Sequence, residues 1–306
     1  MEAALWQPHI RDDSLVAVLY CRMGDAAAGF ISEYQIKCIA PQSTGAEAIL
    51  FLFVAMLKDD MLLALDPVAF SRHIGIDPDP WQAEVLKYDG DRLLLNCCRQ
   101  AGKSTTTATK ALHTAVYRPK SLILVASPTQ RQSQELFRKI RDGVNAMKEP
   151  PKLLEDNKLS MTLANYSRIV SLPGDQATVR GYSGVTMILE DEAAQISDEF
   201  HAAIMPMLII NKGQLISMST PFGKRGFFFD EWTNGSDDWK RIQVTAHECP
   251  RMTPEQLEQQ RRSMGDMFYR QEFECQFVDT VEQTFSYESI QRAFTDDIKP
   301  LFQEVK

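Results

Sequence analysis

The chain has 306 residues, of which 44% are apolar and 24% are charged, with a formal net charge of −8 and a pI near 5.3. This length allows one large α/β domain with small additions, and the balance is that of a globular protein with a sizeable core. The acidic average argues against a general nucleic-acid coat protein. It conceals a basic stretch, since residues 99–152 hold eleven Lys or Arg against three Asp or Glu. Either a charged binding surface or ordinary solvated helix faces would explain that stretch.

The cysteines and the apolar segments indicate the cellular environment. The six cysteines form no C-x-x-C pair, so we expect free thiols in a reducing compartment and no zinc ribbon. The longest apolar run, residues 48–57, is too short to span a bilayer. The N-terminus lacks a basic segment of the kind that opens a signal peptide. We therefore expect a soluble protein without a membrane partner.

The predicted elements begin after residue 60, because residues 1–60 show no sustained hydrophobic period and form an N-terminal extension of unknown role. The Asp77–Pro80 segment is a turn signal. The apolar run at 93–97 predicts a buried strand, and the helix that follows it should end before Pro119. In chain order we predict helices over 81–88, 103–117 and 128–142, strands over 93–97, 121–127, 185–189 and 214–218, and a hairpin of 159–163 with 168–172.

Strands that alternate with helices at this spacing predict an α/β fold, with a mostly parallel central sheet and helices on both faces. We assign this core to residues 61–250 and a helical linker to residues 251–306. In the linker, Thr253 is the predicted N-cap of a helix, Pro254 occupies its first position and Gln256 completes a capping box.

Residues 97–104, Cys-Cys-Arg-Gln-Ala-Gly-Lys-Ser, lie between a predicted strand and a predicted helix, as a phosphate loop requires. Backbone N–H groups at a helix N-terminus attract phosphate oxygens, Lys103 can reach the β- and γ-phosphates, and the Ser104 hydroxyl can bind Mg²⁺. Cys97 stands where the usual motif has its first Gly. A chance G-K-S is the alternative, and the strand–helix context argues against it. The predicted nucleotide-binding residues are Cys98, Arg99, Gln100, Ala101, Gly102, Lys103, Ser104 and Thr105.

An acidic segment, Glu190-Asp191-Glu192, follows the predicted strand at 185–189. Ligands of open α/β sheets bind at the carboxyl ends of the strands. Asp191 is therefore the candidate to hold Mg²⁺ with Ser104, and Glu192 is the candidate to polarise the attacking water. Strand alternation turns Glu190 away from Asp191, so we leave it out of the site. A solvated acidic loop is the alternative.

Further residues complete the predicted site. Ser219 and Thr220 end the next strand and can sense a γ-phosphate, although an ordinary strand-to-loop turn has the same pattern. Arg99 and Arg180 are candidates to stabilise the negative charge that develops during phosphoryl transfer, and a surface salt bridge is the alternative for Arg180. Gln82 offers the donor and the acceptor that an adenine edge requires, unless it is a plain helix-surface residue.

Taken together, these motifs resemble the ATPase domain of tailed-phage large terminases, over about residues 62–295. The segments that carry the resemblance are 99–104 (the deviant phosphate loop R-Q-x-G-K-[ST]), 191–194 (the acidic motif and its trailing small residues), Arg180-Gly181 (an R-G element whose arginine acts on a neighbouring subunit), 219–221 (the coupling motif) and Gln82 (the adenine-recognising glutamine).

The resemblance implies a P-loop NTPase of the additional-strand catalytic-glutamate type, with ATP and Mg²⁺ as cofactors. It implies ATP hydrolysis that drives double-stranded DNA into a viral procapsid, in the host cytoplasm, by a homo-oligomeric ring whose partners are a portal protein and a small terminase subunit. Large terminases carry a nuclease domain after the ATPase, and we expect no nuclease activity in these 306 residues. The alternatives are a non-catalytic or remnant assembly subunit, a helicase-like DNA-repair ATPase and, more remotely, a small-molecule kinase.

Overall fold

The computed structural model describes residues 60–172 and 181–279, with short pieces at 16–19, 36–39, 289 and 292–293. The chain divides into two units, residues 1–65 and 66–306. In the first unit, β1 (Val16–Leu19) pairs antiparallel with β2 (Ile36–Ile39), where no element was predicted. The second unit contains all the candidate site residues.

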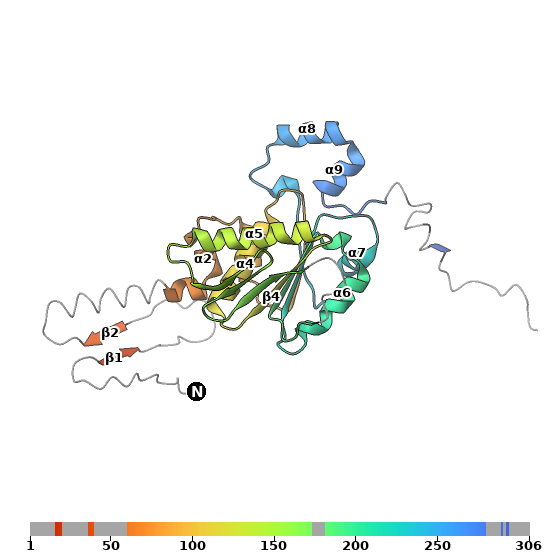
Figure 1. Ribbon diagram of the computed structural model, residues 1–306. Helices are drawn as coiled ribbons and strands as arrows, with labels where there is room; N and C mark the ends of the chain where they lie inside the picture. The colour runs from red at the N-terminus through yellow and green to blue at the C-terminus, as the bar shows by residue number, and fades with distance from the viewer. Residues whose placement is uncertain are drawn as a thin grey trace, which may run out of the picture. The chain divides into compact units, whose positions relative to one another are not determined.

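An eight-stranded sheet forms the centre of the second unit, in the order β10-β3-β9-β8-β4-β7-β6-β5 (Figure 1). The first six strands in this order run parallel, whereas β6 is antiparallel to both β7 and β5. The predicted mostly parallel sheet is therefore confirmed, and the predicted hairpin is the β6–β7 pair. The strands are β3 (Arg92–Cys97), β4 (Leu122–Ala126), β5 (Leu153–Asp156), β6 (Ser160–Leu163), β7 (Arg168–Ser171), β8 (Met187–Asp191), β9 (Gln214–Ser219) and β10 (Lys240–Val244).

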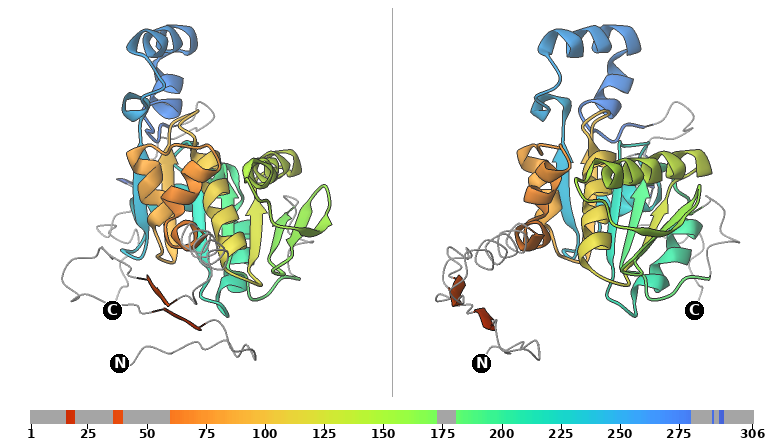
Figure 2. Two further views of the ribbon diagram at one scale, coloured as in Figure 1. Left: turned by 90° about the vertical axis from the view of Figure 1, so that its left-hand side faces the viewer. Right: turned by 60° about the vertical axis from the view of Figure 1, so that its left-hand side comes forward.

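Helices cover both faces of the sheet, with α4 and α5 on one side and α6 and α7 on the other (Figures 1 and 2). Leu94, Leu124, Ile188 and Leu215 of the sheet share one apolar cluster with Phe200 of α6 and Phe228 of α7. No helix in the described ranges is both long and apolar enough to cross a bilayer. The helices are α2 (Pro67–His73), α3 (Pro80–Lys87), α4 (Lys103–Tyr117), α5 (Gln130–Ala146), α6 (Asp198–Ile204), α7 (Gly226–Thr233), α8 (Pro254–Met264) and α9 (Asp266–Glu272), with short 3₁₀ turns η2 (Ala193–Gln195), η3 (Met205–Leu208) and η4 (Ala246–Glu248).

Helix α5 corresponds to the helix predicted over residues 128–142, within the basic stretch. Its N-cap is Thr129, whose hydroxyl accepts a hydrogen bond from the backbone of Gln132. Its inner face is buried, and part of its basic outer face is paired, since Arg138 and Arg141 form ion pairs with Glu135 and Asp156. The basic stretch thus includes solvated helix faces, and salt bridges compensate part of its charge.

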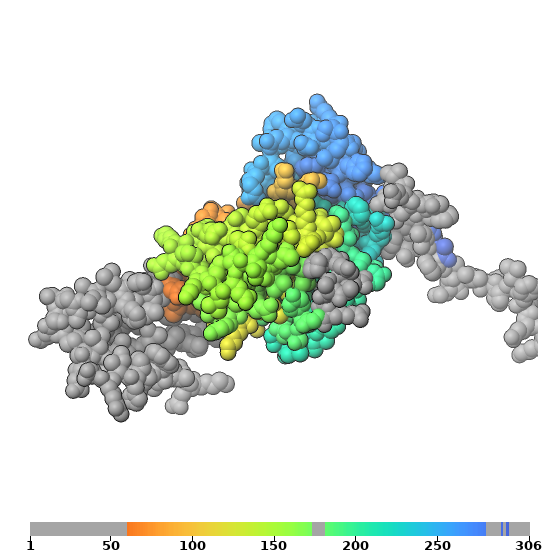
Figure 3. All heavy atoms as spheres, in the orientation of Figure 1, coloured from red at the N-terminus to blue at the C-terminus, as the bar shows by residue number. Residues whose placement is uncertain are grey.

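Helices α8 and α9 stand at the end of the sheet where the phosphate loop lies, and they project from the body of the unit (Figure 3). The predicted capping box of α8 is present, with Thr253 N–H donating to Gln256 Oε1 at 3.0 Å and Gln256 N–H to Thr253 Oγ1 at 3.3 Å. The segment after α9 returns to the sheet, because Asn96 of β3 donates from Nδ2 to the carbonyl of Cys275 at 3.0 Å.

Candidate active site

The predicted phosphate loop joins β3 to α4 at the carboxyl end of the sheet. The backbone turns sharply there, with positive φ at Gln100 (62°) and Gly102 (97°). The positive φ of Gly102 favours glycine, and a Cβ there would also lie 2.7 Å from Nε2 of Gln82, which would have to shift. Since α4 begins at Lys103, its first backbone N–H groups have no partner within the helix and form an anion-binding end.

Lys103 and Glu192 form an ion pair across the loop, with Nζ and Oε1 3.0 Å apart. Burial alone would lower the pKa of Lys103, but the nearby carboxylates of Glu192 and Asp191 outweigh it and raise that pKa. Lys103 is therefore a charged ammonium that the acidic motif holds at the mouth of the loop.

Ser104 and Asp191 form the second contact between the loop and the acidic motif, with the hydroxyl donating to Oδ2 at 3.2 Å. Burial raises the pKa of Asp191, and Lys103 opposes that rise. A hydroxyl and a buried carboxylate side by side are hard oxygen ligands of the kind that Mg²⁺ prefers. The two residues therefore fit the predicted metal site.

Glu192 has a left-handed backbone, with φ 53° and ψ 44°. Such a conformation costs a non-glycine residue about 1–3 kcal/mol and persists only where the surroundings enforce it. It ends β8 and re-aims the Glu192 side chain from the strand toward Lys103. The backbone N–H of Glu192 donates a hydrogen bond to Oδ1 of Asp191 at 3.1 Å, which links the two carboxylate residues.

Ser219 and Thr220 lie at the end of β9, which the sheet order places between β3 and β8. Both residues are buried. The Ser219 hydroxyl has no hydrogen-bond partner among the residues that the structure describes. Because buried hydroxyls are normally bonded, this one is a ready donor to a ligand between the phosphate loop and the acidic motif.

Gln82 is buried against the phosphate loop. Its Oε1 accepts from the N–H of Asp79 at 2.9 Å, and its Nε2 lies 3.5 Å from the carbonyl of Ala101. The structure thus brings Gln82 to the predicted nucleotide site. It also shows the amide already engaged in capping α3, so adenine would have to replace one of these contacts.

The two candidate arginines have different outcomes. Arg99 has 69% of its side chain exposed, and its Nη1 lies 3.7 Å from Oε2 of Glu272 on α9. Arg180 lies outside the described residues, so its role stays a prediction. The structure shows no guanidinium beside Glu192 among the contacts of the described residues.

Arg251 and Cys249 were not predicted and meet the loop from the segment after β10. Arg251 donates to the Ala101 carbonyl at 2.7 Å and pairs with Asp79 at 2.8 Å. Cys249 Sγ lies 3.7 Å from Cys98 Sγ, and this hydrogen bond, helped by Arg251, lowers the pKa of Cys249. No motif or period marks these residues in the sequence.

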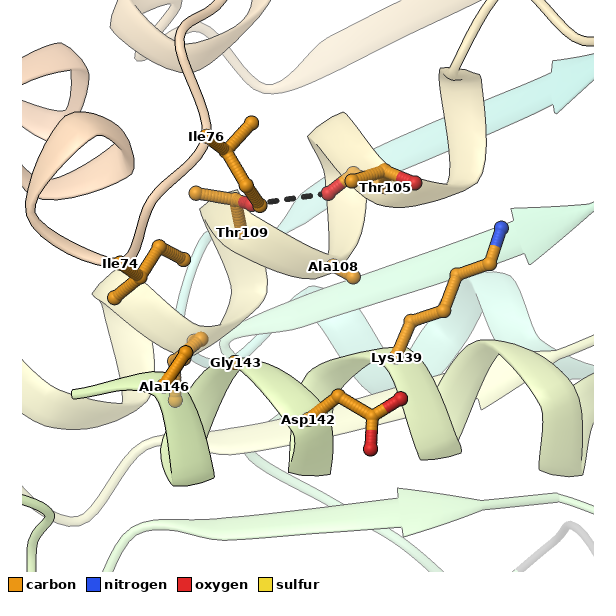
Figure 4. A pocket seen from close by; sticks show the side chains of 10 residues that line it. Ile74, Ile76, Thr105, Ala108, Thr109, Lys139, Asp142, Gly143 and Ala146 are labelled. Carbon is orange, nitrogen blue, oxygen red and sulfur yellow. Dashed lines mark hydrogen bonds between the residues drawn. The ribbon is translucent and has the colours of Figure 1, made fainter.

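Thr105, the last predicted loop residue, lines a separate cavity of about 280 Å³ between α4, α5 and the segment after α2 (Figure 4). Its lining includes the apolar residues Ile74, Ile76 and Leu112 and the charged residues Lys139 and Asp142. Thr105 therefore borders this cavity, while its backbone lies in the first turn of α4.

Known proteins resemble this chain over about two thirds of its length. Residues 94–292 match the family described as "Terminase large subunit, T4likevirus-type, N-terminal". The chain is 24% identical over 252 residues to the terminase large subunit of Thermus phage G20c, an alignment that covers 71% of this chain and 52% of that protein. This chain spans about half the length of the curated relatives it matches.

Solved structures share the fold at low identity. The large terminase ATPase domain of Thermus phage P74-26 has a TM-score of 0.61 at 21% identity, with 68% of this chain and 97% of that chain covered. The large terminase of another thermophilic bacteriophage, in complex with ADP, has a TM-score of 0.56 at 13% identity, with 65% and 53% covered. The predicted P-loop NTPase fold is thereby confirmed.

Proposed function

We propose a function for this chain, which belongs to the family described as "Terminase large subunit, T4likevirus-type, N-terminal". The chain hydrolyses ATP to drive double-stranded DNA into a viral procapsid. The observation that carries the proposal is the meeting of Lys103 with Glu192, at 3.0 Å, beside Ser104 with Asp191, at 3.2 Å. Structural relatives hold ADP or ATP-gamma-S, which supports a nucleotide as the ligand.

The residues divide the chemistry between them. The loop N–H groups and Lys103 would bind phosphate oxygens, and Ser104 and Asp191 would hold Mg²⁺, which would compensate the charge of those oxygens. When Lys103 turns from Glu192 to the phosphates, the Glu192 carboxylate is released to accept a hydrogen bond from the attacking water. The ion pair therefore keeps Glu192 occupied until a nucleotide draws Lys103 away.

The remaining predicted residues act around this centre. Gln82 would recognise the adenine edge, and the free hydroxyl of Ser219, with Thr220, would report the γ-phosphate to β9. Arg180 would complete the site of a neighbouring subunit in a homo-oligomeric ring. Arg99, held by Glu272, would have to leave that contact to act in its own site.

DNA contact would be made through phosphates and would weaken with salt. On α5, Arg131 and Lys139 are exposed and, unlike Arg138 and Arg141, pair with no carboxylate among the described residues. They are candidates for such contacts on α5. A portal protein and a small terminase subunit are the expected partners, and the host cytoplasm is the expected place of action.

Steady-state ATP hydrolysis against protein concentration tests this proposal, with Mg²⁺ and with or without linear double-stranded DNA. We would compare the wild type with Glu192→Ala and with Glu155→Ala, an exposed carboxylate on edge strand β5 as control. A Glu192-dependent rate per subunit that rises with concentration supports an assembling ATPase, and stimulation by DNA supports translocation. Absence of Glu192-dependent turnover at high concentration with DNA would overturn hydrolysis by this chain.

A further inference from the structure

Glu190, the residue before the acidic pair, is a fully buried carboxylate that plays no part in the proposed chemistry. Strand alternation turns it to the opposite face of β8 from Asp191. Burying a carboxylate is strongly unfavourable unless it is paired and hydrogen-bonded. Glu190 therefore needs hydrogen-bond partners inside the protein.

Two partners satisfy this carboxylate. The hydroxyl of Ser217, on the neighbouring strand β9, donates to Oε2 at 2.5 Å. Nδ1 of His201, on α6, lies 2.8 Å from Oε1. This distance is that of a hydrogen bond between the imidazole ring and the carboxyl group. The network thus joins β8, β9 and α6.

The bond between Glu190 and His201 joins residues eleven positions apart in the sequence and closes a loop between them. This loop contains Asp191, the left-handed Glu192 and the 3₁₀ turn η2, so both candidate catalytic carboxylates lie between the two bonded residues. A closed loop has far fewer backbone conformations than an open one. The closure is therefore a physical reason why Glu192 keeps a backbone conformation that costs energy.

The ring of His201 is itself held by α7, the helix that follows β9. It stacks on Phe227 with ring centroids 3.7 Å apart and planes 12° apart. The N–H of Phe227 donates to Oδ1 of Asp198, the first residue of α6, at 2.7 Å. The start of α7, which follows the Ser219–Thr220 segment, therefore bears directly on the histidine that closes the loop.

We propose that Glu190, with His201 and Ser217, is a positioning residue for hydrolysis that holds Glu192 in its active orientation. The proposal rests on the proposed ATPase function. It assigns the network to the hydrolytic step and not to nucleotide binding, because the contacts of these three residues run to β8, β9, α6 and α7. Variants of the network should lower kcat and leave KM for ATP nearly unchanged.

The first test compares ATP hydrolysis by Glu190→Ala and Glu190→Gln, with Ser171→Ala as control. Ser171 is a buried strand serine with a side-chain partner, Ser133, away from the acidic motif. We expect kcat of Glu190→Ala to fall about 10- to 100-fold, the cost of a small misplacement of a catalytic group. Gln has the same shape, its Oε1 can bond to His201 and its Nε2 can donate to the Ser217 hydroxyl, which rotates to accept, so Gln should restore activity to within about threefold.

The second test measures amide hydrogen exchange of residues 191–197 in the same proteins, and in His201→Ala in case Glu190→Ala does not fold. Opening the loop should speed exchange in this segment about tenfold or more, whereas Ser171→Ala should leave it unchanged. Unchanged exchange, an unchanged kcat, or a Gln variant as poor as Ala would each overturn the proposal. If the wild type shows no turnover, the proposed ATPase function fails, and the exchange result alone decides whether the network holds the segment.

Discussion

Helix α4 carries two lysines, at its first turn and near its middle, that are equally buried and differ in their surroundings. Lys103 is 8% exposed and Lys110 is 7% exposed. Carboxylates surround Lys103 and raise its pKa, in spite of burial. Lys110 donates to the backbone carbonyls of Leu86 and Tyr88 at the end of α3, and burial lowers its pKa to about 8.

The difference teaches that burial does not by itself decide the charge of a lysine. Partial charges on two carbonyls do not compensate the loss of water, whereas two carboxylates do. Lys103 therefore keeps its charge, and in the proposed function its ammonium group exchanges Glu192 for a phosphate as its partner. Lys110 is a structural residue that caps the carbonyls of α3 and can lose its proton in mildly alkaline solution.

The largest expected effect is on ATP hydrolysis, and it separates the two lysines of α4. Lys103→Met should lower ATP hydrolysis about 10³-fold, because it removes the cation that binds the phosphates. Lys110→Met, the same substitution seven residues further along α4, should leave hydrolysis within about threefold, since Lys110 does not face the site. Steady-state rates at saturating ATP check both, and equal losses would contradict the distinction between the two lysines.

A smaller effect sharpens the comparison through pH. The folded-state pKa of Lys110, about 8, is below its unfolded value of about 10.4, so the unfolded chain binds more protons between these values. Stability of the wild type should therefore rise relative to Lys110→Met as pH increases, by about 2 kcal/mol between pH 8 and pH 10. Urea unfolding of both proteins at the two pH values measures this, and a gap that does not change with pH would refute the assignment.

The smallest effect is on stability, and it concerns Arg99, an exposed residue of the phosphate loop. Arg99→Ala should change the free energy of unfolding by less than about 0.5 kcal/mol, because its contact with Glu272 is long and the guanidinium is mostly exposed. Arg251→Ala should cost about 1 kcal/mol or more, since it leaves the Ala101 carbonyl without a charged donor. Thermal unfolding without nucleotide would rank the two, and the reverse order would be a failure.

The inner side of the site was predictable because its residues lie in continuous motifs. Lys103 and Ser104 follow one buried strand, and Asp191 and Glu192 end another. Parallel strands place such ends at one edge of the sheet, so sequence alone brought the four together. Alternation also predicted that Glu190 turns away. Its pairing with His201 was not predictable, since it depends on the course of the chain through η2 and α6.

The outer side of the loop was not predictable for a related reason. Arg251 and Cys249 lie about 150 residues from the loop residues that they contact, and the sequence around them has neither a motif nor a period. Glu272 likewise meets Arg99 only because α9 folds back. The predicted trans role of Arg180 lies outside the described residues, and it stays a prediction.

The return of the chain after α9 has a mechanical consequence. The N–H of Arg99 donates to the carbonyl of Glu272 at 2.8 Å, and Asn96 of β3 holds the carbonyl of Cys275. A pull applied through the chain beyond residue 279 therefore meets first the contacts of Phe277 with Phe229 and of Asp279 with Lys224, and next the phosphate loop and β3. With ATP bound at this loop as proposed, a load on this side of the molecule would change the lifetime of the bound nucleotide.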